Sequence, residues 1–240
     1  MKQINILSID FDYFQNVPVN VLACNYPDGH DYEEILSNIV WVSIYGHPYI
    51  SQQILDVTIK DDKLNELINY IKRIKRKIPV CIADSHVKIY NFIKENYQAD
   101  SELNIINIDM HHDVFDVHPE NIHCGNWLKI IMKEYQTDAT WICNPTSLEL
   151  LYTPDNITTI VDDLSGLNDI NFDMIFLCKS IEYIPPHLDK YFIKLAKALS
   201  KIAKPLKCEN IVHTRYNKAF KQMVKQTQSE MQKIINELNN

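Results

Sequence analysis

Residues 107–116 read Asn-Ile-Asp-Met-His-His-Asp-Val-Phe-Asp, and they continue the apolar run that begins at Leu103 and reaches Ile108. An apolar, β-branched run of this length predicts a buried strand, so the acidic and imidazole groups stand where that strand ends. Three potential ligands alternate along the stretch: Asp109, His111 and Asp113. If the extended backbone continues, alternation turns all three side chains to one side, which suits a divalent metal ion.

A solvated turn is the alternative for this stretch, because polar clusters often follow strands and a single histidine is more often structural than a ligand. Three ligand-type residues at every second position favour metal binding over that alternative. His112 has the opposite parity and is expected to face away, and the sequence assigns it no role. The stretch by itself does not name the metal, so matching ligands must come from elsewhere in the chain.

Composition limits the classes of protein to which this chain can belong. Its 240 residues, 46% of them hydrophobic, suffice for a sizeable core and most simply form one domain over residues 1–240. A formal net charge of -7 argues against nucleic-acid binding and mildly favours a cationic substrate. The absence of a transmembrane-length apolar run and of a signal peptide predicts a cytoplasmic protein without a membrane partner.

Cysteine and glycine usage exclude two kinds of site. The 6 cysteines are too scattered for a zinc site of the CxxC type, and most are expected to be reduced thiols in the core. Only 4 glycines occur and they form no glycine-rich loop, which excludes a P-loop and a dinucleotide fingerprint.

Two further ligand-bearing segments also follow predicted strands. The strand over Ile4–Ile9 is followed by two aspartates of equal parity, Asp10 and Asp12, and the strand over Pro79–Ala83 is followed by His86. Capping of a turn is an equally good explanation for the aspartate pair taken alone. Because strand ends of this kind gather at one edge of an α/β sheet, we expect these groups to lie together.

The remaining periodicity completes an alternation of strands and helices. Additional strands are predicted at Ile39–Tyr45, Ala139–Cys143, Thr158–Val161 and Met174–Cys178. Helices are predicted at Asp61–Lys77, Val87–Tyr97, Trp127–Tyr135 and His187–Ala203. This order predicts a three-layer α/β/α fold with a mostly parallel sheet. A polar helical extension at about 205–240, periodic from Thr214 to Leu238, is expected to pack outside the sheet or against another subunit.

The set of motifs resembles the ureohydrolase superfamily, the arginases and agmatinases. That family combines a D-x-H-x-D segment, a D-x-D segment and one further histidine, which together hold two manganese ions. The segment from Asp109 to Asp113 is similar to the first motif, Asp10 and Asp12 are similar to the second, and His86 stands for the separate histidine.

Two more segments resemble the substrate-binding parts of the same family. Glu182-Tyr-Ile-Pro185 is similar to the family's Glu-Val-x-Pro, whose glutamate faces the guanidinium group. Asn121-Ile-His123-Cys-Gly125 is similar to the context of its proton-shuttling histidine. Without this likeness, Glu182 would be read as a carboxylate at a helix N-terminus and His123 as a turn histidine.

The departures from the family pattern are equally informative. In ordinary arginases the D-x-D segment follows the other metal motifs, whereas here it opens the chain, which implies an arginase-like sheet with rearranged strand order. The usual Gly-Gly-Asp-His-Ser is reduced to Asp84-Ser-His86, and the chain is short. These features most resemble the atypical peptide arginases, which convert arginine side chains to ornithine within precursors of ribosomal natural products.

The resemblance implies a ligand set and a mechanism. One Mn²⁺ is expected on Asp10, His86, Asp109 and Asp113, and a second on Asp10, Asp12, Asp109 and His111. The two ions would ionise a shared water, and the hydroxide would attack the guanidinium carbon. Glu182 would hold the guanidinium, His123 would protonate the leaving amine, and Asn126 is assigned to substrate binding. The products are urea and an ornithine side chain in an arginine-containing precursor peptide.

Other functions remain open from the sequence. Asp10-Phe-Asp12 also resembles the nucleophile segment of aspartate-based phosphatases, with Asp162 and Asp163 as the magnesium pair, although a helix cap explains that pair as well. A single-zinc amide deacetylase would need only Asp109, His111 and one more aspartate. A non-enzymatic module could be stabilised by metal and recognise a peptide through its C-terminal helix. Free arginine, agmatine and peptidyl arginine are all possible substrates, and a homo-oligomer is possible.

Overall fold

Seven parallel strands form the centre of the computed structural model, which describes residues 3–27, 32–116 and 121–238. Their order in the sheet is β7-β6-β5-β1-β8-β4-β9, and every neighbouring pair is parallel. The strands are β1 (Ile4–Asp10), β4 (Ile78–Ala83), β5 (Glu102–Asp109), β6 (Gln136–Cys143), β7 (Thr158–Val161), β8 (Met174–Cys178) and β9 (Ala203–Cys208). Outside this sheet, β2 (Gln15–Asn16) pairs antiparallel with β3 (Thr58–Ile59).

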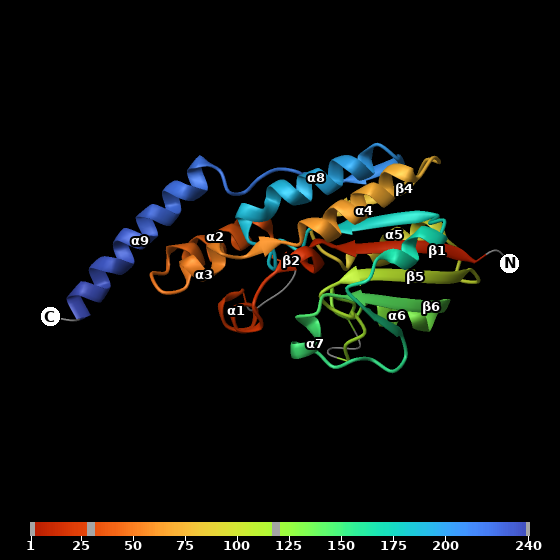
Figure 1. Cartoon of the computed structure of the whole chain (residues 1–240), viewed down its shortest axis with the longest axis horizontal. Coiled ribbons are helices and arrows are strands. Elements are labelled where there is room, and N and C mark those ends of the chain that lie inside the picture. Colours follow the sequence, from red (N-terminus) through yellow and green to blue (C-terminus); the bar gives the residue numbers. More distant parts are fainter. Residues whose placement is uncertain (1–2, 28–31, 117–120, 239–240) are drawn as a thin grey trace.

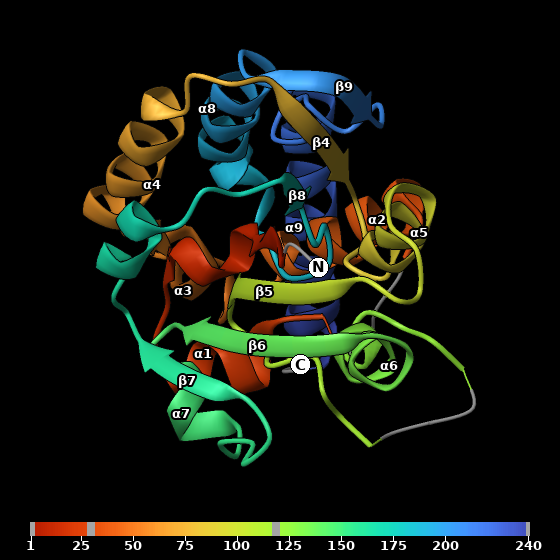
Figure 2. The same cartoon turned by 90° about the vertical axis from the view of Figure 1, so that its right-hand side faces the viewer.

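Helices cover both faces of the sheet, which confirms the predicted three-layer α/β/α class. Figure 2 shows α4 (Asp61–Arg73) and α8 (Asp189–Ser200) on one face, and α5 (Lys88–Asn96) and α6 (Trp127–Glu134) on the other. The remaining helices are α1 (Val19–Asn25), α2 (Glu34–Gly46), α3 (Ser51–Leu55), α7 (Ser147–Leu150) and α9 (Lys218–Leu238). Short 3-10 turns are η1 (Phe11–Phe14), η2 (Ser165–Asp169) and η3 (Pro186–Leu188). No helix in these ranges is long and apolar enough to cross a membrane.

The central strands are apolar on both sides because each face is buried under helices. Along β1, Leu7 and Ile9 pack into the core that contains the α4 and α8 side chains, whereas Ile6 packs into the core of α5 and α6. Cys81, Cys143 and Cys178 are buried thiols of this sheet, as predicted. The strand positions predicted from apolar runs are therefore confirmed for the centre of the sheet.

One predicted strand is wrong. Ile39–Tyr45 lies within helix α2, where Ser37, Trp41 and Tyr45 are buried and Ile39 is exposed. Burial at every fourth residue is the pattern of a helix that packs along one side. The β-branched and aromatic composition of this segment suggested a strand, but tertiary packing overrides such preferences.

The C-terminal part also differs from the prediction. Ala203–Cys208 forms the edge strand β9 beside β4, so the predicted helix stops earlier, at Ser200, and the segment from 205 begins as a strand. Most side chains of β9 are exposed, so no apolar pattern marks it. Helix α9 extends away from the sheet and lies along α2 (Figure 1), where the Gln228 side chain donates to the Tyr45 carbonyl at 3.2 Å.

Candidate metal centre

All six predicted metal ligands lie at the carboxyl end of the sheet. Asp10 and Asp109 are the last residues of β1 and β5, which are neighbours, and His86 follows β4, two strands from β1. From β1 the chain passes to β4 on one side of this strand and then to β5, β6 and β7 on the other, so the strand order reverses at β1. Ligand sites of open α/β sheets are found at such reversals.

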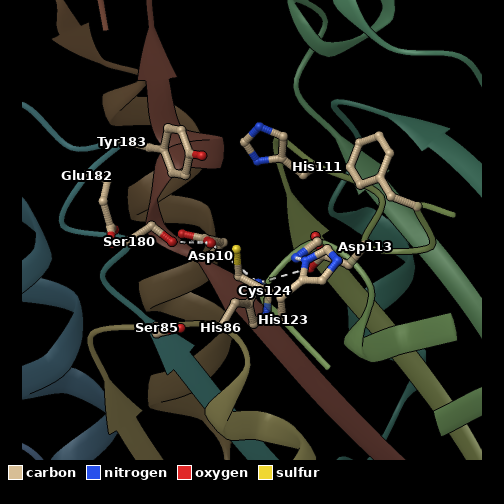
Figure 3. Close-up of a pocket in the computed structure, with 12 residues that line it drawn as sticks. Asp10, Ser85, His86, His111, Asp113, His123, Cys124, Ser180, Glu182 and Tyr183 are labelled. Atoms are coloured by element: carbon tan, nitrogen blue, oxygen red, sulfur yellow. Dashed lines mark hydrogen bonds and ion pairs between the residues drawn. The ribbon is translucent and has the colours of Figure 1, made fainter. Parts of the chain in front are cut away.

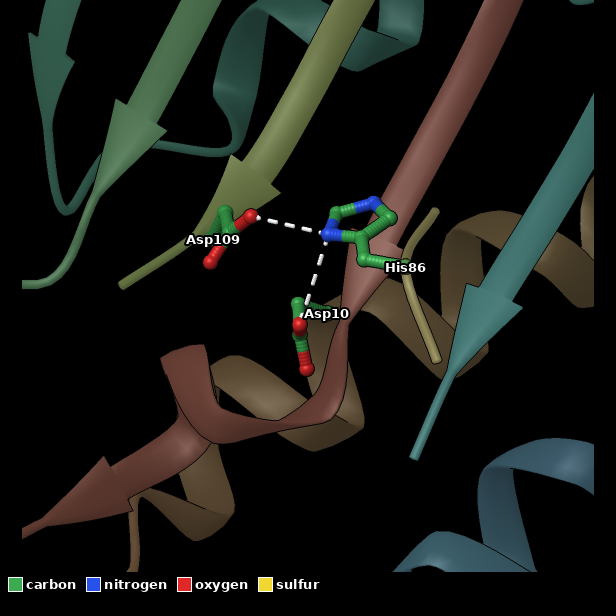
Figure 4. A group of neighbouring side chains, drawn as sticks. All are labelled: Asp10, His86 and Asp109. Carbon is green, nitrogen blue, oxygen red and sulfur yellow. Dashed lines mark ion pairs between the residues drawn. The ribbon is translucent and has the colours of Figure 1, made fainter. Parts of the chain in front are cut away.

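The first cluster, here called the inner group, consists of Asp10, His86 and Asp109 (Figure 4). His86 Nδ1 lies 3.3 Å from Asp10 Oδ2 and 3.1 Å from Asp109 Oδ2. Asp113 Oδ2 lies 3.1 Å from the same nitrogen. All four residues are buried, so these carboxylates and this imidazole form one buried site.

The second cluster, the outer group, consists of Asp12, Asp109 and His111. His111 Nδ1 lies 3.3 Å from Asp12 Oδ2 and 3.8 Å from Asp109 Oδ1. Asp109 therefore belongs to both groups and turns one carboxylate oxygen toward each. The His111 side chain is 31% exposed, which makes it the open edge of the cluster.

After Asp109 the backbone turns, whereas the prediction from alternation assumed that it stays extended as far as Asp113. Strand β5 ends at Asp109, and Asp113 has a φ of 55°, in the left-handed region that non-glycine residues seldom adopt. The indole N–H of Trp127 donates to Asp113 Oδ2 at 2.6 Å and fixes that carboxylate. Asp12 lies in the turn η1, and its backbone N–H donates to Asp10 Oδ1 at 3.4 Å. The predicted ligands therefore do lie together, but turns after the strands, and not alternation along an extended chain, bring them there.

Polar neighbours hold the ligands in place, as second partners of metal ligands do. Three of them were missed by sequence reasoning: Ser8, Asn107 and Ser180. Ser8 Oγ lies 2.6 Å from His86 Nε2, the Asn107 amide donates to Asp109 Oδ2 at 3.2 Å, and the Ser180 hydroxyl donates to Asp10 Oδ2. Ser8 and Asn107 each stand two residues before a ligand on the same strand. Side chains two residues apart on a strand point to the same face, so this spacing could have identified both residues from the sequence.

Negative charge is concentrated in these two groups of buried ligands, and it shifts the pKa values of several of them. Burial, followed by the charges of Asp113 and Asp10, raises the pKa of Asp109 to about 8. Burial, with the charges of Asp10 and Asp109, raises the pKa of Asp12 to about 7. Burial alone would lower the pKa of His111, but Asp12, Asp109 and Asp113 raise it to about 10. Without another cation, the cluster retains protons.

The residues present fit a divalent metal ion. Asp12 Oδ2 is buried and makes no hydrogen bond among the described residues, and the atom that approaches it is His111 Nδ1 at 3.3 Å. Such a buried, unsatisfied acceptor is rare and calls for a partner. The donors are carboxylate oxygens and imidazole nitrogens without a thiolate, a hard mixed set. These buried Asp and His groups could therefore hold a metal ion.

A pocket of about 210 Å³ opens beside the cluster (Figure 3). Both residues that the likeness assigned to catalysis, His123 and Glu182, line it. Glu182 is only 3% exposed, and its Oε1 accepts from the Tyr32 backbone N–H at 2.5 Å. Gly125 N–H donates to His123 Nδ1 at 3.2 Å, which orients the imidazole.

Asn126, assigned to substrate binding, is not among the residues that line this pocket. Its Oδ1 accepts from the His123 backbone N–H and its amide donates to the Asn121 carbonyl, both at 2.8 Å. With the side chain 1% exposed, both ends of the amide are used within the turn. Asn126 thus shapes the loop that carries His123, and the structure does not bring it to the pocket.

A buried arginine that sequence reasoning missed anchors the loop after β8, which carries the pocket glutamate. Arg215 Nη1 donates to the Ile181 carbonyl and Nη2 to the Ile184 carbonyl, both at 2.6 Å. Its guanidinium also contacts both oxygens of buried Asp189. Lys179 Nζ lies 3.5 Å from Asp189 Oδ1, and burial lowers the pKa of this lysine to about 8. No pattern in the sequence marks Arg215.

The other ionisable residues noted in the sequence lie elsewhere. His112 is buried against the rings of Phe115 and Trp141 and belongs to neither ligand group, so it faces away as predicted. Burial lowers its pKa to about 4. Asp162 accepts from the Tyr13 hydroxyl and from Lys60, while Asp163 accepts from the Ser165 backbone N–H. Neither aspartate lines the pocket that contains Asp10. The magnesium pair of the phosphatase alternative is therefore not assembled there.

No protein-family model, curated protein or solved structure matches this chain. The function is therefore inferred from the geometry of the site and from the motifs that build it.

Proposed function

We propose that this protein is a manganese-dependent hydrolase of the ureohydrolase type, which converts peptidyl arginine to ornithine and releases urea in the cytoplasm. The observation that carries the proposal is the shared carboxylate of Asp109, which turns one oxygen to the inner group and one to the outer group. A shared carboxylate between two ligand groups is the arrangement that a two-ion site requires.

The residues that would hold the inner ion are Asp10, His86, Asp109 and Asp113. Those that would hold the outer ion are Asp12, Asp109 and His111, and we assign Asp10 to both ions. Manganese suits this set because carboxylates and imidazoles without thiolates favour hard divalent ions. When bound, the two ions supply hydroxide near neutral pH by lowering the pKa of water.

The pocket residues would bind and polarise the guanidinium. Glu182 is the buried carboxylate next to the inner group, and a charge-assisted, two-point contact to a planar guanidinium is among the strongest polar contacts in proteins. His123 lines the same pocket and would donate a proton to the leaving amine, the general-acid role that histidine most often takes in enzymes.

The charge of the pocket favours peptidyl arginine over free arginine. Among the described residues that line it, there is no lysine or arginine. A guanidinium group therefore meets no repulsion, whereas the α-carboxylate of free arginine would find no cationic partner. An arginine inside a peptide lacks that carboxylate, which is why we propose a precursor peptide as the substrate.

The test uses mass spectrometry on an arginine-containing peptide incubated with Mn²⁺-loaded protein. We expect loss of CH₂N₂ from the peptide and release of urea. Glu182→Gln should lower kcat/KM by roughly 100-fold, because the truncated charge pair leaves the guanidinium poorly held. Glu237→Gln, at an exposed position on α9, is the matched control and should retain full activity.

Two results would contradict the proposal. The first is no mass change in peptide, free arginine or agmatine with fully metal-loaded protein. The second is unchanged activity of Glu182→Gln. Release of phosphate from a generic phosphate ester with Mg²⁺ would instead favour the phosphohydrolase alternative.

A further inference from the structure

A second hollow of about 490 Å³ lies beside the metal pocket, between helices α1 and α7. These two helices, distant in sequence, contact each other and lie side by side in Figures 1 and 2. Its apolar lining comes from both helices, from the end of α1 and from the residue after β5: Leu22, Tyr26, Pro27, Met110, Leu150 and Leu151. The described residues around it include no aspartate, glutamate, lysine or arginine. The hollow is therefore suited to an uncharged group that can contact both the apolar side chains and the polar atoms between them.

The two pockets share a wall. His111 and Tyr183 line both of them, and their ring centroids are 5.3 Å apart. Figure 3 shows the two rings next to each other above Asp10, and their planes are tilted by 52°. Tyr183 directly follows Glu182, and His111 belongs to the outer group. A molecule whose guanidinium reaches Glu182 would therefore pass along this wall and bring its neighbouring atoms to the apolar hollow.

One polar atom in the hollow lacks a partner. Ser147 is fully buried, lines the hollow, and its Oγ makes no hydrogen bond within the described part of the chain. Buried hydroxyls almost always find a partner, so an unsatisfied one in a cavity wall indicates a group that arrives from outside. A peptide main chain offers such groups, an N–H and a carbonyl at each residue.

We propose that this hollow is a specificity pocket for an apolar side chain, leucine-like or aromatic, on a substrate residue that neighbours the reacting arginine. Ser147 Oγ contacts the main chain of the same peptide segment. This inference rests on the proposed function, because it assumes that the guanidinium occupies the pocket beside Glu182. It adds a recognition rule: the enzyme selects arginines that have an uncharged apolar neighbour.

The experiment measures equilibrium binding by fluorescence anisotropy, together with turnover by mass spectrometry, on Mn²⁺-loaded protein. The probes are labelled peptides that differ only in the residues flanking one arginine: leucine, phenylalanine, serine or aspartate. Leucine and phenylalanine peptides should bind roughly 10- to 100-fold more tightly than the serine peptide, because burying one such side chain contributes that much. The aspartate peptide should bind most weakly.

Variants locate the preference. Leu22→Ser and Leu150→Ser should each reduce the leucine-over-serine preference, and both residues are partly exposed, so folding is retained. Ser147→Ala should weaken all peptides by a similar factor, about 2- to 10-fold, since it removes one main-chain contact. Ile234→Ser, which removes an exposed apolar residue on α9, is the matched control and should leave the preference unchanged.

The outcomes separate the two proposals. Turnover of all peptides with equal affinity would overturn the specificity pocket and leave the hydrolase intact. A flanking-residue preference that Leu22→Ser reduces, without any turnover, would support the pocket while the hydrolase proposal fails. A preference that survives both leucine variants would place recognition elsewhere and overturn the inference.

Discussion

The inner and outer groups share Asp109 but differ in their surroundings. His86, in the inner group, is 2% exposed and has Ser8 against its second ring nitrogen. His111, in the outer group, has a side chain that is 31% exposed and borders two pockets. Ligands held on every side bind an ion more tightly than ligands at an open edge. We therefore expect a tightly held inner ion and an outer ion that exchanges more readily and faces the substrate.

The largest effect is expected from the residue that joins the groups. Asp109→Asn keeps the shape of the side chain but removes the charge from both groups, so both ions should be lost after dialysis. Metal content per chain, measured by elemental analysis, checks this. The matched control is Asp163→Asn, because Asp163 follows β7 and caps a turn away from the cluster, and it should leave the metal content unchanged. Unchanged metal in Asp109→Asn would remove the two-ion proposal.

Removing His86 and His111 one at a time tests whether the inner group holds its ion more tightly than the outer group. His86→Ala should abolish the inner ion and destabilise the metal-free fold by about 3–5 kcal/mol, because a cation buried among carboxylates is lost. His111→Ala should remove the outer ion and lower stability by only about 1 kcal/mol, as expected for a partly exposed pair. Metal content and urea denaturation of each variant are the measurements. Equal losses of metal and of stability in the two variants would show that the inner and outer groups do not differ in how they hold an ion.

A smaller, graded effect is expected from pH. The pKa of Asp109 is raised from 3.8 to about 8 and that of His111 from 6.5 to about 10, so the folded protein binds more protons than the unfolded chain. Stability of the metal-free protein should therefore fall as pH rises from 6 to 9, by on the order of a few kcal/mol. Metal replaces these protons, so affinity for Mn²⁺ should rise over the same range.

Urea midpoints at pH 6 and pH 9, with chelator and with Mn²⁺, measure both trends. Asp109→Asn, which cannot take up this proton, serves as the control and should reduce the pH dependence of the metal-free protein, while the part due to His111 remains. Greater stability of the metal-free wild-type protein at pH 9 than at pH 6 would contradict the charge concentration described for the cluster.

The metal ligands could be predicted because they follow buried strands. The apolar runs over Ile4–Ile9 and Leu103–Ile108 mark two neighbouring central strands, and parallel strands deliver their last residues to one edge. Local geometry could not be predicted, since the spacing of the ligands indicates neither the left-handed φ of Asp113 nor the hydrogen bond from Trp127 that holds its carboxylate. The resemblance to the ureohydrolases identified His123 and Glu182, and both line the pocket. It also assigned Asn126 to substrate binding, but the side chain of Asn126 is used in hydrogen bonds within its own turn.

Strand β9 and helix α2 were not predicted from the sequence, because neither shows the regular spacing of apolar residues that marks its type of element. Strand β9 has exposed side chains because it forms an edge, and its identity depends on main-chain pairing with β4. Helix α2 carries apolar residues on its exposed side as well, among them Ile35 and Ile39, which blurs its periodicity. Arg215 and the hollow lined by Ser147 depend on contacts between segments far apart in the chain, which no single window of sequence contains.

Arg215 has a consequence for synthesis of the protein. The loop that presents the pocket glutamate is anchored by a guanidinium from the segment between β9 and α9, close to the C-terminus. A nascent chain on the ribosome can pair β1 with β5 before this segment is translated, and β4 joins these strands once β8 has followed. The loop that carries Glu182 can be anchored only after Arg215 has been translated. A premature stop before Arg215 would leave Asp189 buried without its guanidinium partner, and the product would lack an ordered pocket even if it binds metal.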